Sequence, residues 1–98
     1  MYCMEHLLAL LTTEKAKKLE FRAGGPPMIV LEYKRYPLQG PPITAEDVLR
    51  LFRSVATSRQ MWNLRECGSV QFIYALPDRS AFLVQAKIED EQIVFEVS

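Results

Sequence analysis

Leu19-Glu20-Phe21-Arg22-Ala23-Gly24-Gly25-Pro26-Pro27-Met28 is the stretch that decides the fold of this chain. Its first residues alternate between apolar and polar, which is typical of a strand with one buried face. The two glycines can adopt positive φ angles and the two prolines withhold backbone donors, so the strand must stop and turn here. An apolar run restarts at Met28. The stretch therefore predicts a strand, a turn and a second strand.

Elements on either side of this turn are predicted from the spacing of apolar residues. An amphipathic helix ending near Thr13 is indicated by the i, i+3, i+4, i+7 spacing of Met4, Leu7, Leu8 and Leu11. Strands are expected at residues 18–23, 28–33 and 34–38, and the Gly-Pro-Pro loop that follows ends this part of the chain.

Two helices are expected in the middle of the chain. Thr44 can cap the first, and Glu46 and Asp47 suit the positive end of its dipole. Ser58 is the expected cap of the second helix, and Gly68 can end it in the left-handed conformation.

The last third of the chain predicts an antiparallel meander. Apolar residues alternate over 70–76, 82–88 and 93–97, and short turns at 77–80 and 89–92 separate the three runs. The order of elements indicates an α+β fold, an antiparallel sheet with helices packed mainly on one face. We expect one core to include Val48, Leu51, Phe52, Val70, Phe72, Tyr74, Phe82 and Val84.

Composition bounds the class of protein. The 98 residues are 49% hydrophobic and 10% aromatic, which is enough for a packed core. Twelve basic and twelve acidic residues give zero formal charge, so neither nucleic acid nor an anionic membrane is an expected partner. No signal sequence or membrane-spanning run is recognisable, and two widely spaced cysteines indicate reduced thiols. We therefore expect a cytoplasmic protein without direct membrane insertion.

Blocks at 16–21, 22–28, 42–48 and 68–77 occur in an order and at spacings that resemble one known family. They are similar to the N-terminal domain of the hexameric ATPases that retract type IV pili in twitching motility. The run at 68–77 resembles that family's Gly-Glu-Val-Asp-Phe-Ser-Tyr-Ala-Leu-Pro strand, with Gln71 in place of aspartate. The resemblance covers nearly the whole chain. It implies a single PAS-like domain over residues 1–98.

The departures from this family fall on polar positions. After the matched strand the family has Arg-Phe-Arg-Val-Asn, whose arginines can reach the nucleotide at the boundary between two domains. Here the same place reads Ala81-Phe82-Leu83-Val84-Gln85, and no Gly-x-x-x-x-Gly-Lys-Ser/Thr loop exists in the sequence. The resemblance therefore implies the scaffold without the nucleotide chemistry, and we expect no enzymatic activity and no cofactor.

Side chains that could carry other chemistry are few. Cys3 and His6 form a Cys-x2-His pair, but zinc needs three or four ligands and Cys67 is the only other soft candidate. The carboxylates at 89–91 lie in a predicted turn, where they would be solvated rather than arranged as acid and base. We expect no catalytic residue and no metal site.

The candidate partner-binding surface consists of apolar residues in the last three strands. A sheet with one wet face should be polar on that face, yet Ile73, Leu83 and Val94 occupy such positions, so the N-terminal helix or another molecule should cover them. The last strand, 92–97, is a candidate sheet edge with Ile93 and Phe95 on its other face. Alternatively, this strand lies centrally and the exposed surface lies on the helices.

These observations lead to one functional hypothesis and two alternatives. The first is a non-enzymatic interaction or regulatory module that binds a motor subunit or another component of a pilus or secretion machinery, or that pairs with itself as a two-fold dimer. The alternatives are a PAS-like sensor holding a small ligand between sheet and helices, and a truncated fragment of a motor. An apolar cavity would favour the sensor, whereas an exposed apolar face would favour partner binding.

Overall fold

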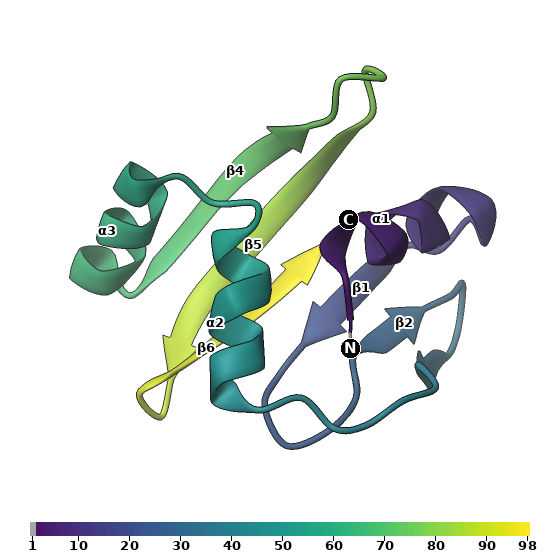
Figure 1. Ribbon diagram of the computed structural model, residues 1–98, viewed down its shortest axis with the longest axis horizontal. Coiled ribbons are helices and arrows are strands. Elements are labelled where there is room, and N and C mark those ends of the chain that lie inside the picture. Colours follow the sequence, from purple (N-terminus) through teal and green to yellow (C-terminus); the bar gives the residue numbers. More distant parts are fainter. Residues whose placement is uncertain (1) are drawn as a thin grey trace.

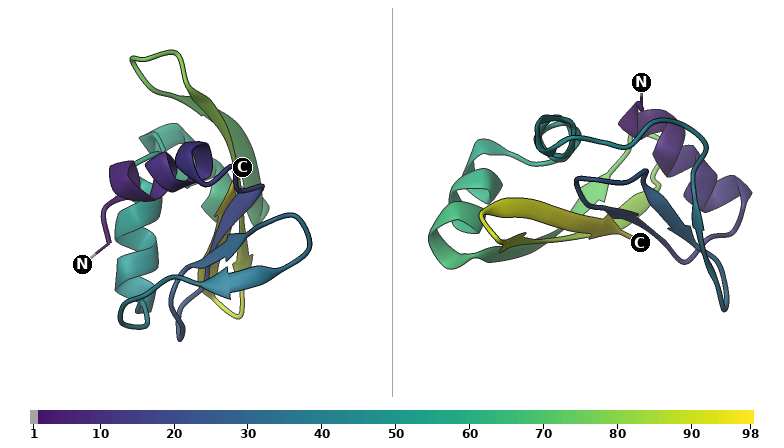
Figure 2. Two further views of the ribbon diagram at one scale, coloured as in Figure 1. Left: turned by 90° about the vertical axis from the view of Figure 1, so that its right-hand side faces the viewer. Right: turned by 90° about the horizontal axis from the view of Figure 1, so that it is seen from below.

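The computed structural model describes residues 2–98 of the chain. Its elements in chain order are α1 (Met4–Thr13), β1 (Lys18–Phe21), β2 (Met28–Val30), β3 (Arg35–Pro37), α2 (Ala45–Arg53), α3 (Ser58–Cys67), β4 (Ser69–Ala75), β5 (Ala81–Glu89) and β6 (Gln92–Val97). The strands form one antiparallel sheet in the order β3-β2-β1-β6-β5-β4 (Figure 1). All three helices lie on one face of this sheet and leave the other face bare (Figure 2). The predicted α+β fold is confirmed.

The stretch at residues 19–28 turns as predicted, and backbone hydrogen bonds fix the turn to a distant segment. Gly24 adopts a φ of 103°, a conformation that favours glycine. Its N–H donates to the Ile43 carbonyl at 2.9 Å, and the Ile43 N–H donates to the Gly25 carbonyl at 2.9 Å. The turn therefore holds the chain that enters α2, and it positions that helix over the sheet.

Both central helices begin with a capping box. The Thr44 hydroxyl accepts a hydrogen bond from the Asp47 N–H, and the Asp47 carboxylate accepts one from the Thr44 N–H. Thr57 and Gln60 form the same arrangement at the start of α3. The cap of α3 is therefore Thr57 and not Ser58 as expected, because Gln60 stands three residues after Thr57. Gly68 ends α3 with a φ of 81°, as predicted.

The predicted core is correct for α2 and β5 and only partly correct for β4. Val48, Leu51, Phe52, Phe82 and Val84 are buried, and rings from Phe21, Phe52 and Phe95 pack in the layer between helices and sheet. Val70, Phe72 and Tyr74 also face this layer but are only partly buried. The reason is that β4 is an edge strand, so no neighbouring strand covers its outer side.

The prediction that the last strand forms a sheet edge is wrong. β6 lies between β1 and β5, pairing with both. The edges of the sheet are β3 and β4. The alternative, a central last strand, is the observed arrangement. It buries Phe95 and Val97 completely in the layer beneath the helices. Within residues 2–98, no helix has the length and apolar character needed to cross a lipid bilayer.

Candidate functional site

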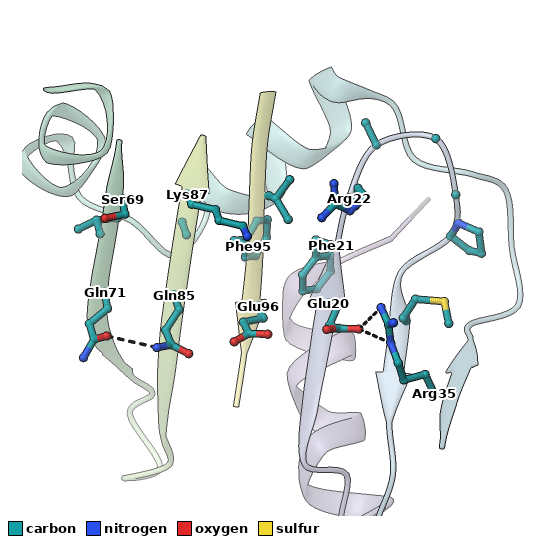
Figure 3. Close-up of a pocket in the computed structure, with 18 residues that line it drawn as sticks. Glu20, Phe21, Arg22, Arg35, Ser69, Gln71, Gln85, Lys87, Phe95 and Glu96 are labelled. Carbon is teal, nitrogen blue, oxygen red and sulfur yellow. Dashed lines mark hydrogen bonds and ion pairs between the residues drawn. The ribbon is translucent and has the colours of Figure 1, made fainter. Parts of the chain in front are cut away.

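The face of the sheet that lies away from the helices, called the open face here, is the candidate functional site. Alternation along the strands places on it the side chains of Lys18, Glu20, Arg22, Met28, Arg35, Gln71, Ile73, Leu83, Gln85, Lys87, Val94 and Glu96. Part of this face, together with the Gly-Gly-Pro turn after β1, forms a hollow of about 930 Å³ (Figure 3). No helix covers it.

A row of polar side chains crosses the middle of the open face. Gln71, Gln85, Glu96 and Glu20 stand on four successive strands, and the Gln85 amide donates to Gln71 Oε1 at 3.2 Å (Figure 3). Glu20 and Glu96 are directly opposite each other, an arrangement of like charges that is unfavourable by itself. Cations must therefore stand beside them.

Two cations offset this pair of carboxylates. Lys18 Nζ lies 3.0 Å from Glu96 and 3.8 Å from Glu20, and Arg35 reaches Glu20 at 2.6 Å. The hydrogen bond to Glu96 raises the pKa of Lys18 above its usual value. Since each charge has a partner of opposite sign, the middle of the open face is a solvated polar surface rather than a site for a free ion.

A second ion-pair cluster joins β1 to the end of β5. Arg22 donates to both carboxylate oxygens of Glu89, at 2.8 and 3.4 Å, and Lys87 lies 3.0 Å from the same carboxylate. The hydrogen bonds from Arg22 and then from Lys87 lower the pKa of Glu89 to about 2. The carboxylates at 89–91 are predicted to be solvated, and Glu89 is indeed partly exposed, but its ion pairs with Arg22 and Lys87 are not predicted from the sequence. Its main partner is 67 positions away, a distance at which no local pattern reports a contact.

The lowered pKa of Glu89 predicts how the stability of the fold changes in acid solution. A carboxyl group whose pKa is depressed in the folded state stabilises the fold fully above the usual pKa, here 4.5. That contribution is lost as the pH falls from 4.5 towards about 2. An NMR titration of the Glu89 carboxyl carbon should therefore give a midpoint near 2. Arg22→Gln should move this midpoint upward, because Arg22 is the largest cause of the shift.

Arg35→Gln is the matched control, since it removes an arginine that pairs with Glu20 on the same face. It should leave the midpoint of Glu89 in place. A wild-type midpoint at the ordinary value of 4.5 would contradict the ion-pair geometry.

Only part of the predicted partner-binding surface is brought together. Ile73 and Leu83 are directly opposite each other on β4 and β5, and the Ile73 side chain is 63% exposed. Val94 is on the same face but stands opposite Lys87. Lys87 is four residues from Leu83 along β5, so Val94 is separated from Leu83. Of the predicted residues, Ile73 and Leu83 are therefore the two that stand side by side on the open face, next to Gln71 and Gln85 of the polar row.

Ile93 and Phe95 lie on the face beneath the helices, and the structure corrects their assignment to the partner-binding surface. Phe95 is only 2% exposed, with its ring stacked on Phe21 at a centroid distance of 4.4 Å. Ile93 is partly buried against the same core. The expectation that the N-terminal helix covers the apolar open-face residues is also wrong, because α1 packs with the other helices on the opposite face.

The space between sheet and helices, where a PAS-like sensor would hold its ligand, is occupied by aromatic rings. Phe52 contacts Phe95 at a centroid distance of 5.3 Å and Phe72 at 6.1 Å. A smaller apolar hollow of about 310 Å³ lies elsewhere, between α1 and the β2–β3 hairpin, and its lining includes Leu10, Ile29 and Tyr36. The filled core weakens the sensor hypothesis.

The remaining candidate residues are dispersed. Cys3, His6 and Cys67 are all exposed, and both cysteines are free thiols. Across residues 2–98, no three His, Cys, Asp or Glu side chains are grouped so that they could hold a metal ion. Ala81 and Leu83, which occupy the place of the arginines in the resembling family, both lie on the open face and bring no charge to it.

Comparison with known proteins finds similarity in structure and none in sequence. No protein-family model matches the chain, and no curated protein matches it. The pilus retraction motor PilT, solved with bound ADP, superposes with a TM-score of 0.84 at 20% identity, over 99% of this chain and 28% of that chain. The ATPase DotB of Legionella pneumophila superposes with a TM-score of 0.74 at 13% identity, over 96% of this chain and 26% of that chain.

The chain thus spans little more than a quarter of the length of these two solved ATPases. At such low identity the similarity establishes the fold and not the activity. The matched part of both ATPases is their N-terminal part. This chain has the fold of the N-terminal part of PilT and DotB.

Proposed function

We propose that this protein is a non-enzymatic interaction module that binds a subunit of a pilus or secretion ATPase, or another component of the same machinery, through the Ile73–Leu83 pair. The observation that carries the proposal is the match of 99% of this chain to only 28% of the motor PilT. The fold that forms one part of the ATPase PilT spans nearly all of this chain, and the open face of the sheet is bare.

The chemistry of the open face supports a protein partner. The Ile73–Leu83 pair is an exposed apolar spot, and the neighbouring Gln71 and Gln85 continue into the ion-paired polar row. Protein interfaces commonly have this composition, an apolar centre within a polar rim.

The proposal is tested by direct binding. The fluorescently labelled chain is titrated with purified subunits of the pilus retraction ATPase of the same organism, and binding is followed by anisotropy. We expect saturable binding that does not need nucleotide. A chain that fails to bind both this ATPase and the related secretion ATPase would contradict the proposal.

A second prediction concerns nucleotide. Because the sequence has no phosphate-binding loop and no cation at position 81 or 83, the chain should neither bind nor hydrolyse Mg-ATP. Isothermal titration calorimetry with Mg-ATP checks the binding, and release of inorganic phosphate checks the hydrolysis. Saturable binding of Mg-ATP in the micromolar range would contradict the non-enzymatic assignment.

A further inference from the structure

The two edges of the sheet differ sharply in how they are protected. β3 has three residues, including Arg35 and Pro37, and a short strand with a charge and a proline is a typical protected edge. β4 has seven residues, Ser-Val-Gln-Phe-Ile-Tyr-Ala, without charge, proline or glycine. Long uncharged edges of this kind are templates for pairing with another strand. The unprotected edge of this molecule is therefore β4.

The backbone groups that β4 directs outward follow from its pairing with β5. The Ile88 N–H donates to the Gly68 carbonyl, and the Leu76 N–H donates to the Ser80 carbonyl, each within 2.9 Å. Hydrogen-bonded positions alternate along an antiparallel pair, so the even-numbered residues of β4 direct their backbone groups to β5. The odd-numbered residues, Ser69, Gln71, Ile73 and Ala75, direct theirs away from the sheet.

The core is also incomplete at this edge. On the face beneath the helices, Val84 of β5 and Phe95 of β6 are buried, whereas Val70, Phe72 and Tyr74 of β4 are only partly buried. α3 lies alongside β4 (Figure 1), and its Trp62 is 61% exposed. Although α3 packs against β4, the apolar side chains of this strand therefore remain partly exposed.

We propose that β4 pairs edge to edge with β4 of a second copy of this chain, forming an antiparallel two-fold dimer with Phe72 opposite the same residue of the second copy. In this register Gln71 faces Ile73 of the second copy, Ser69 faces Ala75, and every outward N–H and C=O of the strand finds a partner. This proposal goes beyond the proposed function, because its partner is a second copy of the chain and its contact is the edge of the sheet.

Three features favour a second copy as the occupant. β4 has no charge, so two copies can lie side by side without opposing like charges. The two-fold arrangement would place Phe72 of one copy beside Phe72 of the other and Tyr74 beside Val70, and so extend the incomplete core across the junction. The remaining edge of each copy is the protected β3, so assembly would stop at the dimer instead of growing into a fibre.

Sedimentation equilibrium of the chain alone, over a wide concentration range, measures the association. The wild type should approach twice the monomer mass of 11.3 kDa as its concentration rises. Ile73→Pro removes the outward backbone N–H of residue 73, which makes no hydrogen bond within the fold. Because each copy loses one such donor, the variant should weaken the dimer about tenfold. Ile73→Thr keeps the N–H and the β-branched shape and should retain the dimer.

Hydrogen exchange gives a test that needs no variant. The amides of Gln71 and Ile73 should exchange rapidly in dilute solution and slowly in concentrated solution, whereas those of Phe72 and Tyr74, bonded to β5, should be protected in both. A wild type that stays monomeric at every concentration, or a dimer whose Gln71 and Ile73 amides exchange rapidly, would overturn the proposal. Because the chain is measured alone, neither result decides whether it binds an ATPase.

Discussion

Replacing Phe95 by alanine is expected to lower the free energy of unfolding by about 3–5 kcal/mol, the usual cost of removing a buried aromatic side chain. Phe95 is 2% exposed on the central strand β6, stacks on Phe21 at 4.4 Å and contacts Phe52 at 5.3 Å. Since the free energy of unfolding of a small domain is only about 5–15 kcal/mol, this loss is a large part of the total stability. Urea denaturation followed by circular dichroism measures it.

Phe72→Ala is the matched control for this experiment. Phe72 faces the same layer and contacts Phe52, but it lies on the edge strand and is only partly buried. Its replacement should therefore cost clearly less than that of Phe95. Equal losses for the two variants would contradict the assignment of β6 to the centre and β4 to the edge of the sheet.

Leu83→Lys is expected to weaken binding to the ATPase partner about thirtyfold or more, the effect of losing one central apolar contact of about 2 kcal/mol. Leu83 is partly exposed and, with Ile73, forms the apolar spot of the open face. A lysine there would place an ammonium group in the centre of the proposed interface. The anisotropy titration described above measures the change in the dissociation constant.

Ala9→Lys is the control for this second variant. Ala9 is exposed on α1, in the layer of helices on the other side of the sheet, so the same charge is added away from the open face. Its binding should match that of the wild type. If both lysine variants weaken binding equally, net charge rather than the Ile73–Leu83 pair governs the association.

Local patterns in the sequence were sufficient for the elements and insufficient for their order in the sheet. The capping residue Thr44, the terminator Gly68 and the alternation within the last three strands act over a few residues, and all were predicted correctly. The pairing of β1 with β6 joins Leu19 to Val97 and is not encoded by any nearby residue. Without this pairing the last strand has only one neighbour, which is why it was predicted to be an edge.

The same limit explains which candidate residues were assigned correctly. Ile73 and Leu83 belong to strands joined by a short turn, so their alternation was enough to place both on one face. The prediction of an edge strand places Phe95 on the partner-binding surface, whereas pairing of β6 on both sides buries it. The ion pair between Arg22 and Glu89 depends on the β1–β6 pairing too, because β6 connects β1 to β5.

The most direct test of the account is a map of the surface that the ATPase partner contacts. Amide chemical shifts of the isotopically labelled chain are recorded during titration with the unlabelled ATPase subunit. The largest changes should fall on β4 and β5 around Ile73, Leu83 and Gln85, with α1 and α2 little affected. Changes confined to the helices, or none at saturating partner, would contradict the central claim that the open face is the interaction surface.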